Sequence, residues 1–306
     1  SAEEEIEALL DAEGPGGGEV DHVGVATDSY LEHITDRFGS DLSHLRIAVD
    51  CANGAYSAIA PKAFEQLGAR VTAIGAEPDG SNINLGCGAT DLALLQRTVL
   101  QGDFDLGIAF DGDGDRMLAV DANGAPVDGD QILAILAEHL GVDLVAVTQM
   151  TNFGFHRFAE ERGIRLVTTD VGDRYVLEAL REHRGVLGGE QSGHIIYLKD
   201  HVTGDGLAAA LLLCAALAGR SLAEAAAVLP RFPQAKDNVR VATKTLSDGL
   251  RAEIERLNDE LGGAGRILVR PSGTEPVVRV LAEAENPQKA QELCARISAL
   301  VTRELG

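Results

Sequence analysis

The stretch Phe104-Asp-Leu-Gly-Ile-Ala-Phe-Asp-Gly-Asp-Gly-Asp-Arg-Met-Leu-Ala-Val120 decides how this chain folds. Its apolar run at 106–110 predicts a buried strand, and a second apolar run at 117–120 predicts another strand. Between them lies an acidic loop, Asp111–Arg116, in which aspartates alternate with glycines. Glycine permits tight backbone curvature, so all of the carboxylates can point inward. The pattern predicts a strand that delivers a cluster of acids to one place.

The acidic loop needs a cation, because the carboxylates of Asp111, Asp113 and Asp115 would otherwise repel one another at close range. Hard oxygen ligands in this number suit Mg²⁺ with positions left open for a phosphate oxygen. An acidic surface turn is the simplest alternative. A calcium-binding EF-hand loop is excluded, because Arg116 stands at its sixth position, where glycine is required, and Ala122 at its twelfth, where glutamate is required.

An aspartyl-nucleophile phosphatase is an alternative from a different enzyme class. Such enzymes carry an Asp-x-Asp-Gly motif after a strand, which Asp111–Gly114 fits with Asp111 as the nucleophile. Against it, Asp115 stands where threonine or valine is expected, and the chain continues into a strand instead of a helix. The alternative stays open from the residues alone.

Apolar runs and helically spaced segments alternate on both sides of the acidic loop. Strands are predicted at 45–50, 70–74, 144–148 and 165–169, and helices at 56–67, 92–99, 131–140, 155–162 and 175–183. This alternation predicts an α/β fold with mostly parallel sheets covered by helices. We expect a connector helix and Gly/Pro linker at 1–20, three-layer α/β domains at 21–123 and 124–234, and a small α+β domain at 235–306, with two helices on one side of its sheet.

Composition limits the classes of partner. The chain has 306 residues, 45% of them hydrophobic, and a net charge of −22, which disfavours nucleic acid and anionic membrane surfaces. An anionic substrate must therefore be held by local arginines, backbone N–H groups or a metal. The four cysteines lack paired spacing, and no apolar run is long enough to span a membrane, so we expect reduced thiols in a cytoplasmic protein.

A second loop, the 188–194 loop, reads Gly188-Gly-Glu-Gln-Ser-Gly-His194. Its carboxylate, amide, hydroxyl and imidazole offer the mixture of donors and acceptors that sugar hydroxyls need. A turn in which Ser192 and His194 merely cap backbone groups is the alternative. Nearby, Asp173 and Arg174 open a predicted helix, where Asp173 could cap the helix or, with Arg174, contact a ligand.

A third loop, the 270–276 loop, reads Arg270-Pro-Ser-Gly-Thr-Glu-Pro276 and is followed by Arg279. Its backbone N–H groups can form an anion nest, and guanidinium groups bind phosphate bidentately. A Pro/Gly hairpin explains the turn but not two arginines and two hydroxyls together. The loop therefore indicates phosphate binding.

Taken in this order, the loops resemble the metal, sugar and phosphate loops of the α-D-phosphohexomutase family, and the resemblance covers nearly the whole chain. Asp50-Cys-Ala-Asn-Gly-Ala55 and Pro78-Asp-Gly-Ser-Asn-Ile-Asn84 are also similar to that family. Gly86-Cys-Gly-Ala-Thr-Asp91 and Gln191 most resemble the branch that acts on glucosamine phosphate. The phosphomannomutase/phosphoglucomutase branch is the alternative.

The resemblance implies reversible transfer of phosphate between O6 and O1 of glucosamine phosphate, through a phosphoserine and a 1,6-bisphosphate intermediate, for UDP-N-acetylglucosamine and cell-wall synthesis. It implies that the acidic loop binds Mg²⁺ and that Arg116 assists proton transfer or binds the phosphoserine. It also implies two further binding sites. The sugar would contact Asp173, Arg174, Glu190, Ser192 and His194. The phosphate that is not reacting would be held by Arg270, Ser272, Gly273, Thr274 and Arg279.

The serine loop of the family, Thr/Ala-Ser-His-Asn-Pro in an amino-terminal domain, is not found in this sequence. Ser43-His44 is the only Ser-His pair, and no Asn-Pro follows it. We therefore expect a fragment that lacks the first domain, binds weakly and turns nothing over, as a monomer whose full-length parent is a dimer. A module that only senses a sugar phosphate is the non-enzymatic alternative.

Overall fold

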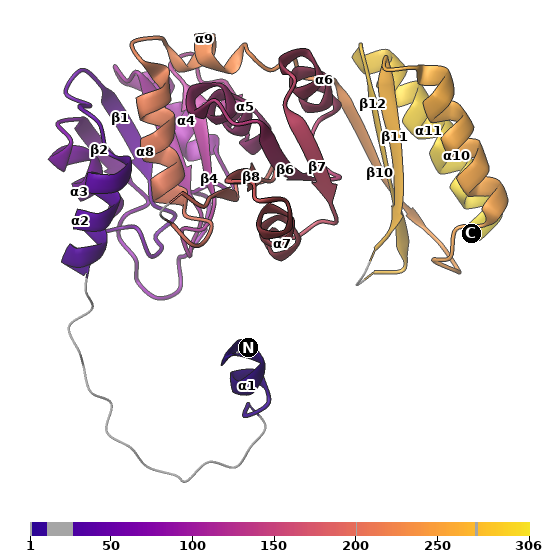
Figure 1. Cartoon of the computed structure of the whole chain (residues 1–306), viewed down its shortest axis with the longest axis horizontal. Coiled ribbons are helices and arrows are strands. Elements are labelled where there is room, and N and C mark those ends of the chain that lie inside the picture. The colour runs from indigo at the N-terminus through magenta and orange to yellow at the C-terminus, as the bar shows by residue number, and fades with distance from the viewer. Residues whose placement is uncertain (1, 11–26, 200, 273–274) are drawn as a thin grey trace.

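The computed structural model describes residues 2–10, 27–199, 201–272 and 275–306 of the chain. Helix α1 (Ala2–Glu7) stands where the connector helix is expected, whereas the predicted linker at 13–20 lies outside the described residues. The rest of the described chain forms three sheets with flanking helices, which run from left to right in Figure 1. We refer to residues 27–127, 128–232 and 234–306 as the first, second and C-terminal units.

The first unit is built on a five-stranded sheet in the order β2-β1-β3-β4-β5. The strands are β1 (Arg46–Asp50), β2 (Arg70–Ile74), β3 (Leu106–Phe110), β4 (Met117–Asp121) and β5 (Pro126–Val127), and the helices are α2 (Thr27–Phe38), α3 (Ala60–Gln66) and α4 (Ala93–Gln101). Strand β3 is buried along its whole length, as a strand covered on both faces should be.

The second unit holds a four-stranded sheet in the order β7-β6-β8-β9. Its strands are β6 (Leu144–Thr148), β7 (Arg165–Thr169), β8 (Leu187–Gly189) and β9 (Ile195–Tyr197), and its helices are α5 (Gly129–Leu140), α6 (Phe153–Arg162), α7 (Asp173–His183), α8 (Gly206–Leu217) and α9 (Leu222–Ala226). Helix α5 begins with a capping box between Asp128 and Gln131 and ends at Gly141 in the left-handed conformation.

In both sheets the central strands are parallel, as expected, and antiparallel strands are added at one edge. β1 pairs in parallel with β2 and β3, and β6 with β7 and β8, but β3–β4, β4–β5 and β8–β9 are antiparallel. The physical reason is loop length. The acidic loop and the 188–194 loop are too short for a parallel crossover, which needs a dozen or more residues, so each can only join an antiparallel pair. Each sheet therefore carries a candidate site loop between neighbouring strands.

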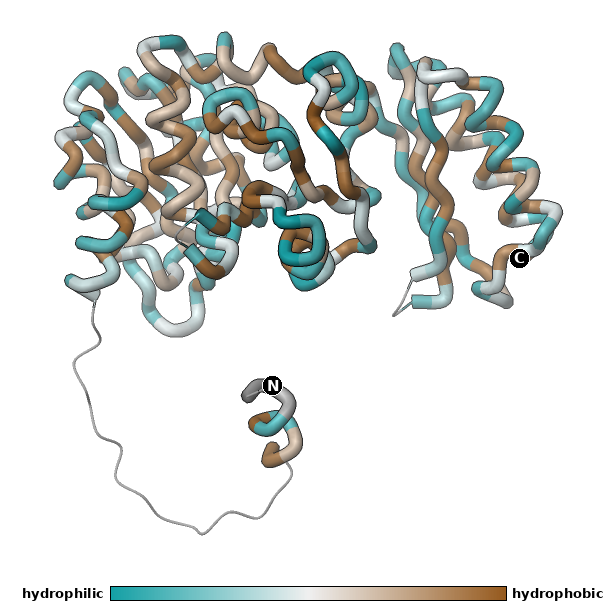
Figure 2. The backbone as a smooth tube through the Cα atoms, in the orientation of Figure 1, coloured by the Kyte–Doolittle hydropathy of each residue, from teal (hydrophilic) through white to brown (hydrophobic). Residues whose placement is uncertain are grey.

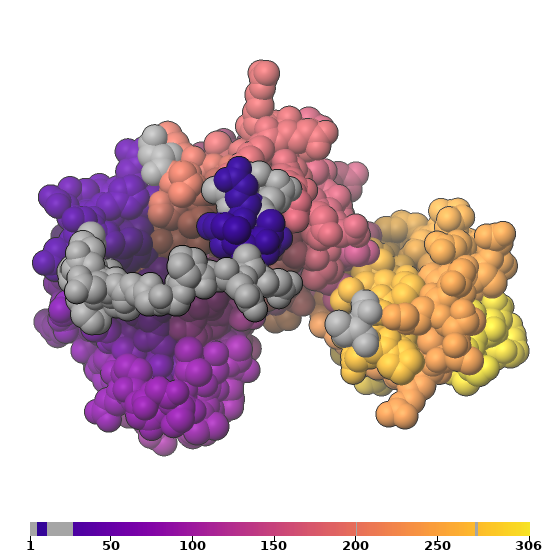
Figure 3. Space-filling view, turned by 90° about the horizontal axis from the view of Figure 1, so that it is seen from below, coloured from indigo at the N-terminus to yellow at the C-terminus, as the bar shows by residue number. Residues whose placement is uncertain are grey.

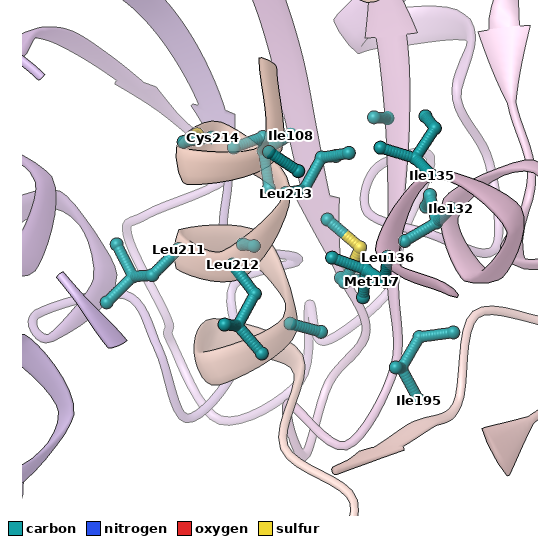
Figure 4. Close-up of a cluster of buried hydrophobic side chains, with 14 of the residues drawn as sticks. Ile108, Met117, Ile132, Ile135, Leu136, Ile195, Leu211, Leu212, Leu213 and Cys214 are labelled. Carbon is teal, nitrogen blue, oxygen red and sulfur yellow. The ribbon is translucent and has the colours of Figure 1, made fainter. Parts of the chain in front are cut away.

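Helix α8 joins the first and second units into one core. It packs against β3 and β4 of the first sheet and against α5 of the second unit. Nearly every residue of α8 is buried, which agrees with its continuous Ala/Leu sequence. Figure 4 shows Leu213 of α8 beside Ile108 of the first unit, with Met117 of β4 and Leu136 of α5 on the same side of the helix, whereas Leu211 points to the opposite side. Burial of each such side chain stabilises the fold by about 1.5–3 kcal/mol.

The C-terminal unit has a core of its own. Its antiparallel sheet has the order β10-β12-β11, and its elements are β10 (Gln234–Arg240), α10 (Asp248–Leu261), β11 (Gly265–Pro271), β12 (Val277–Ala284) and α11 (Pro287–Leu305). Both helices cover one face of the sheet, as expected, and the opposite face is turned toward the second unit (Figure 1). Figure 2 shows hydrophobic residues on the inner sides of these helices and strands, and Figure 3 shows the unit as a separate lobe.

The cysteines and the lengths of the helices also bear on the sequence predictions. All four cysteines are buried and unpaired, so none forms a disulfide. None of the helices in the described part of the chain is both long enough and apolar enough to cross a membrane.

Candidate active site

The acidic loop is organised by one buried carboxylate. Asp111 follows the last residue of β3 and is fully buried. Its Oδ1 accepts hydrogen bonds from the N–H groups of Gly114 (3.2 Å) and Arg116 (3.1 Å), and its Oδ2 accepts from Arg116 Nε at 2.6 Å. Gly114 has a φ of +82°, and an added Cβ would lie 2.6 Å from the ring of Tyr56. This position therefore requires glycine on two counts.

The carboxylates of Asp111, Asp113 and Asp115 come together, with one oxygen of each lying within 4.8 Å of the others. Asp115 Oδ1 is buried without a hydrogen-bond partner among the described residues, and its nearest cation is Arg116 Nε at 3.4 Å. Clustered carboxylate oxygens with unused lone pairs are the ligands that a hard divalent cation prefers. The residues present thus fit a divalent metal ion, and Arg116 partly balances the charge of the cluster.

The 188–194 loop is bonded directly to the acidic loop. Met117 N–H donates to Gly193 O at 3.0 Å, and Arg116 and His194 form an antiparallel bridge. The buried imidazole of His194 donates from Nδ1 to Asp115 Oδ2 at 2.9 Å. This hydrogen bond to one carboxylate oxygen fixes the direction of the other oxygen, Asp115 Oδ1. Hydrogen bonds of this kind typically support metal-binding carboxylates. His194 therefore orients a candidate metal ligand.

Glu190 connects the 188–194 loop to the start of α7. Its Oε1 accepts from Gly172 N–H at 3.0 Å, and its Oε2 accepts from Ser192 Oγ at 3.2 Å. The helix cap is Gly172, without a side-chain cap hydrogen bond, so the interpretation of Asp173 as the cap is wrong. Gly172 takes that place because its φ of 137° suits glycine. Asp173 Oδ2 instead lies 4.0 Å from His194 Nε2.

Arg174 projects from the first turn of α7 and is largely exposed, with its Nε 2.9 Å from Glu178 Oε1 on the same helix. It thus pairs along α7 in this structure. The start of α7 and the 188–194 loop follow β7 and β8 of the second sheet, and contacts of His194 and Glu190 bring them together with the acidic loop of the first sheet.

The 270–276 loop and Arg279 form a separate part of the site. Arg270 and Arg279 face each other in the β11–β12 register, and burial together with the charge of Arg279 lowers the pKa of Arg270. Arg279 Nε is buried without a hydrogen-bond partner among the described residues, although its Nη2 reaches Glu275 at 3.2 Å. Two close guanidinium groups with a spare donor favour an anion between them.

Both arginines line a cavity of about 360 Å³, together with Lys236 on β10 and Met150 of the second unit. Ser272 is buried and its hydroxyl accepts from Glu275 N–H at 3.3 Å. Gly273 and Thr274 lie outside the described residues. No acidic-loop residue lines this cavity. Sequence reasoning missed Lys236, because a lone lysine on a strand carries no signal.

A polar cluster behind the acidic loop was also missed. Tyr30 Oη donates to Asp205 Oδ2 at 2.8 Å, and Tyr56 Oη donates to Asp205 Oδ1 at 3.0 Å. Although burial opposes it, His201 Nε2 at 3.3 Å from Asp205 Oδ2 and hydrogen bonds from the Ala208 N–H and both tyrosines hold the pKa of Asp205 below its ordinary value. The next residue, Gly206, donates its N–H to Gly114 O at 3.0 Å. The cluster thus anchors the acidic loop to α8, and only the cap at Asp205 is readable from sequence.

Three family models match the chain in the order of these units. They are the phosphoglucomutase/phosphomannomutase α/β/α domain II at residues 28–124, α/β/α domain III at 128–232 and the C-terminal domain at 237–300. This chain belongs to the phosphoglucomutase/phosphomannomutase family. Relatives named phosphoglucosamine mutase, which are isomerases, match at similar strength across several species. That from Pelotomaculum thermopropionicum is 48% identical over 98% of this chain and 72% of its own length. That from Streptomyces coelicolor is 47% identical over 96% of this chain and 67% of its own length.

Solved structures show the same fold. The N-acetylphosphoglucosamine mutase of Aspergillus fumigatus, solved with GlcNAc-6P and magnesium, has a TM-score of 0.76 at 22% identity, covering 94% of this chain and 67% of that chain. A phosphoglucomutase/phosphomannomutase family protein of Burkholderia thailandensis has a TM-score of 0.78 at 25% identity, covering 92% and 66%. The mixed sheets described above are therefore those of phosphohexomutases.

Proposed function

We propose that these residues form the metal, sugar and phosphate sites of a phosphoglucosamine mutase, which interconverts glucosamine 6-phosphate and glucosamine 1-phosphate. The observation that carries the proposal is the hydrogen bond from His194 to Asp115, because it joins the sugar-type loop to the acidic cluster in a single site. The names of the relatives favour this branch over phosphomannomutase/phosphoglucomutase.

In this proposal Asp111, Asp113 and Asp115 hold Mg²⁺, which offsets the charge on a transferring phosphoryl group. Arg116 neutralises part of the same charge and binds the phosphoserine or assists proton transfer. The position of Arg116 Nε, 2.6 Å from Asp111 Oδ2 and 3.4 Å from Asp115 Oδ1, supports that role because it places a positive charge beside the acidic cluster.

Sugar hydroxyls contact the 188–194 loop. Glu190 and Ser192 bind the sugar directly, since both side chains lie at the surface of the loop, and Asp173 and Arg174 border the same surface. His194 acts near them by orienting Asp115. The phosphate that does not react is held by Arg270, Ser272 and Arg279 together with Gly273 and Thr274, and the spare Nε donor of Arg279 supports this assignment.

The phosphoryl donor in this proposal is a phosphoserine, and the reaction passes through a 1,6-bisphosphate. The 306 residues contain no Ser-His-Asn-Pro segment, and we therefore propose that another domain supplies the donor and that the chain alone turns nothing over. The product serves UDP-N-acetylglucosamine and cell-wall synthesis in the cytoplasm. We also propose that the complete enzyme is a dimer and that the domain division lies at 123/124 and 234/235.

A coupled assay for glucosamine 1-phosphate tests the proposal. The chain alone should show no turnover, whereas the same chain fused behind the amino-terminal domain of a phosphoglucosamine mutase should be active in Mg²⁺. Asp113→Asn should abolish that activity, and Asp103→Asn, at an exposed acid outside the loop, should not. An inactive fusion that folds and binds Mg²⁺ would refute the proposal.

The phosphatase alternative receives no support from the geometry. Asp111 would be the nucleophile of a motif that leads into a helix, but here the acidic loop leads into strand β4, antiparallel to β3. Phosphate release from p-nitrophenyl phosphate by the chain alone, abolished by Asp111→Asn, would reverse this conclusion.

A further inference from the structure

The side chain of Gln191 is bonded to the start of helix α5. Its Nε2 donates to Asp130 Oδ2 at 3.1 Å and to Asp128 Oδ2 at 3.3 Å, and its backbone O accepts from Gly129 N–H at 3.1 Å. Both the side chain and the backbone of Gln191 are therefore held by the first turn of α5. Gln191, one of the residues on which the resemblance to the glucosamine-phosphate branch rests, is thus bonded to α5.

Asp130 is bonded both to Gln191 and to the start of α6. It is 1% exposed, and its Oδ2 also accepts from Asn152 N–H at 2.8 Å. Asn152 exchanges two hydrogen bonds of 2.9 Å with the backbone of Phe232, through Nδ2 to Phe232 O and from Phe232 N–H to Oδ1. Phe232 lies in the segment that leads into the C-terminal unit, so one buried carboxylate connects the 188–194 loop with that segment.

The next residue along the chain continues the network into the C-terminal sheet. Phe153 N–H donates to Glu283 Oε1 at 3.1 Å, and Glu283 is fully buried on β12. Its Oε2 accepts from Arg266 Nε at 2.9 Å, while Arg266 Nη2 donates to Thr151 O at 2.9 Å. A buried ion pair with filled hydrogen bonds has a narrow range of geometries, because displacement leaves a charge unpaired. These contacts form the joint between the second and C-terminal units.

We propose that Gln191 is a positioning residue, which couples the 188–194 loop through Asp130 and Asn152 to the joint formed by Glu283 and Arg266. The joint fixes β11 and β12, and these strands carry Arg270 and Arg279. One hexosamine phosphate that contacts both the loop and these arginines needs a fixed distance between them. This use of the coupling rests on the proposed function, whereas the coupling itself can be measured without a substrate.

Hydrogen exchange on the intact chain tests the coupling. Glu283→Gln keeps the shape of the side chain but removes its charge, and Glu285→Gln is the matched control at an exposed glutamate nearby. We expect exchange of peptides over 189–195 to rise about five-fold or more in Glu283→Gln and to stay unchanged in Glu285→Gln. Because linkage is reciprocal, Gln191→Met should raise exchange at Phe153 and at 232–236. The proposal would be overturned if Glu283→Gln left exchange at 189–195 unchanged and Gln191→Met left exchange at Phe153 and at 232–236 unchanged.

Calorimetry with glucosamine 6-phosphate and Mg²⁺ adds a test of function. If the joint sets the distance, Gln191→Met and Glu283→Gln should weaken binding by similar factors, and the double variant should be no weaker than the worse single variant. If the loss of affinity in the double variant equals the product of the losses in the two single variants, the coupling is overturned. Failure of the unmodified chain to bind counts against the proposed function, while exchange still decides the coupling. If Glu283→Gln does not fold, exchange at Phe153 in Gln191→Met decides it alone.

Discussion

Asp130→Asn should flatten the dependence of stability on pH. Asp130 is almost fully buried, and burial together with the charge of Asp128 raises its pKa from 3.8 to about 7, although the Asn152 N–H acts in the opposite direction. A carboxyl whose pKa is raised by folding stabilises the native state fully below its unfolded pKa and loses that contribution as the pH rises through its folded pKa. The wild-type chain should therefore lose stability between about pH 4 and pH 7 from this residue.

The size of the effect follows from the same two values. A rise in pKa from 3.8 to about 7 corresponds to about 4 kcal/mol at 1.36 kcal/mol per pH unit, as an upper limit. The asparagine can still accept the hydrogen bonds from Asn152 and Gln191 through its one oxygen. Its amide replaces Asp130 Oδ1, which is buried without a partner, so it adds a cost of about 1–3 kcal/mol that does not vary with pH.

Urea unfolding at constant ionic strength from pH 4.5 to pH 8 measures the difference. The free energy of unfolding of wild type minus that of Asp130→Asn should fall as the pH rises and should level off above about pH 8. Asp143→Asn, at an exposed aspartate of the same unit, should run parallel to wild type. A constant difference between wild type and Asp130→Asn across this range would show that Asp130 is already ionised at low pH and would refute the reasoning.

Three other changes have separate physical causes. His194→Ala should weaken binding of Mn²⁺, used as a spectroscopic substitute for Mg²⁺, by about 10–100-fold, because Asp115 loses the group that orients it; an unchanged affinity in a paramagnetic titration would count against that role. Leu213→Ala, at a fully buried position of α8, should lower the free energy of unfolding by about 2–5 kcal/mol, whereas Leu100→Ala, at an exposed position, should change it little. Burial raises the pKa of the Cys214 thiol to about 12, so DTNB should leave Cys214 unmodified until urea unfolds the chain; rapid modification at pH 8 would contradict this.

The local sequence pattern was sufficient to predict features that depend on a single helix or loop. The continuous apolar sequence of α8 predicts burial on all sides, and the glycines of the acidic loop predict three converging carboxylates; the structure has both. The family, the fold class and the relation to phosphoglucosamine mutases are also confirmed. The roles of individual site residues and the domain boundaries stay predictions.

Pairing across long sequence distances could not be predicted. Periodicity shows which face of an element is buried but not what covers it, so Tyr30 and Tyr56 gave no indication that they meet at Asp205. Gln191 was read by its place in a loop, whereas its direction depends on acids about sixty positions earlier in the chain. The sequence pattern also did not indicate the order of strands within a sheet, such as the position of β1 between β2 and β3.

The position of α8 has a consequence for how this protein can be divided. Sequence comparison separates the chain between residues 124 and 128, but α8 lies after that point and fills the core of the part before it. A cut at this boundary would leave the β3–β4 face of the first sheet uncovered and would remove the contacts of α8 with α2, β3 and β4. The C-terminal unit encloses its own core, so an exchange between relatives at the segment before β10 would have to preserve only the joint at Glu283 and Arg266. When this chain is recombined with relatives, the first and second units should therefore be kept together.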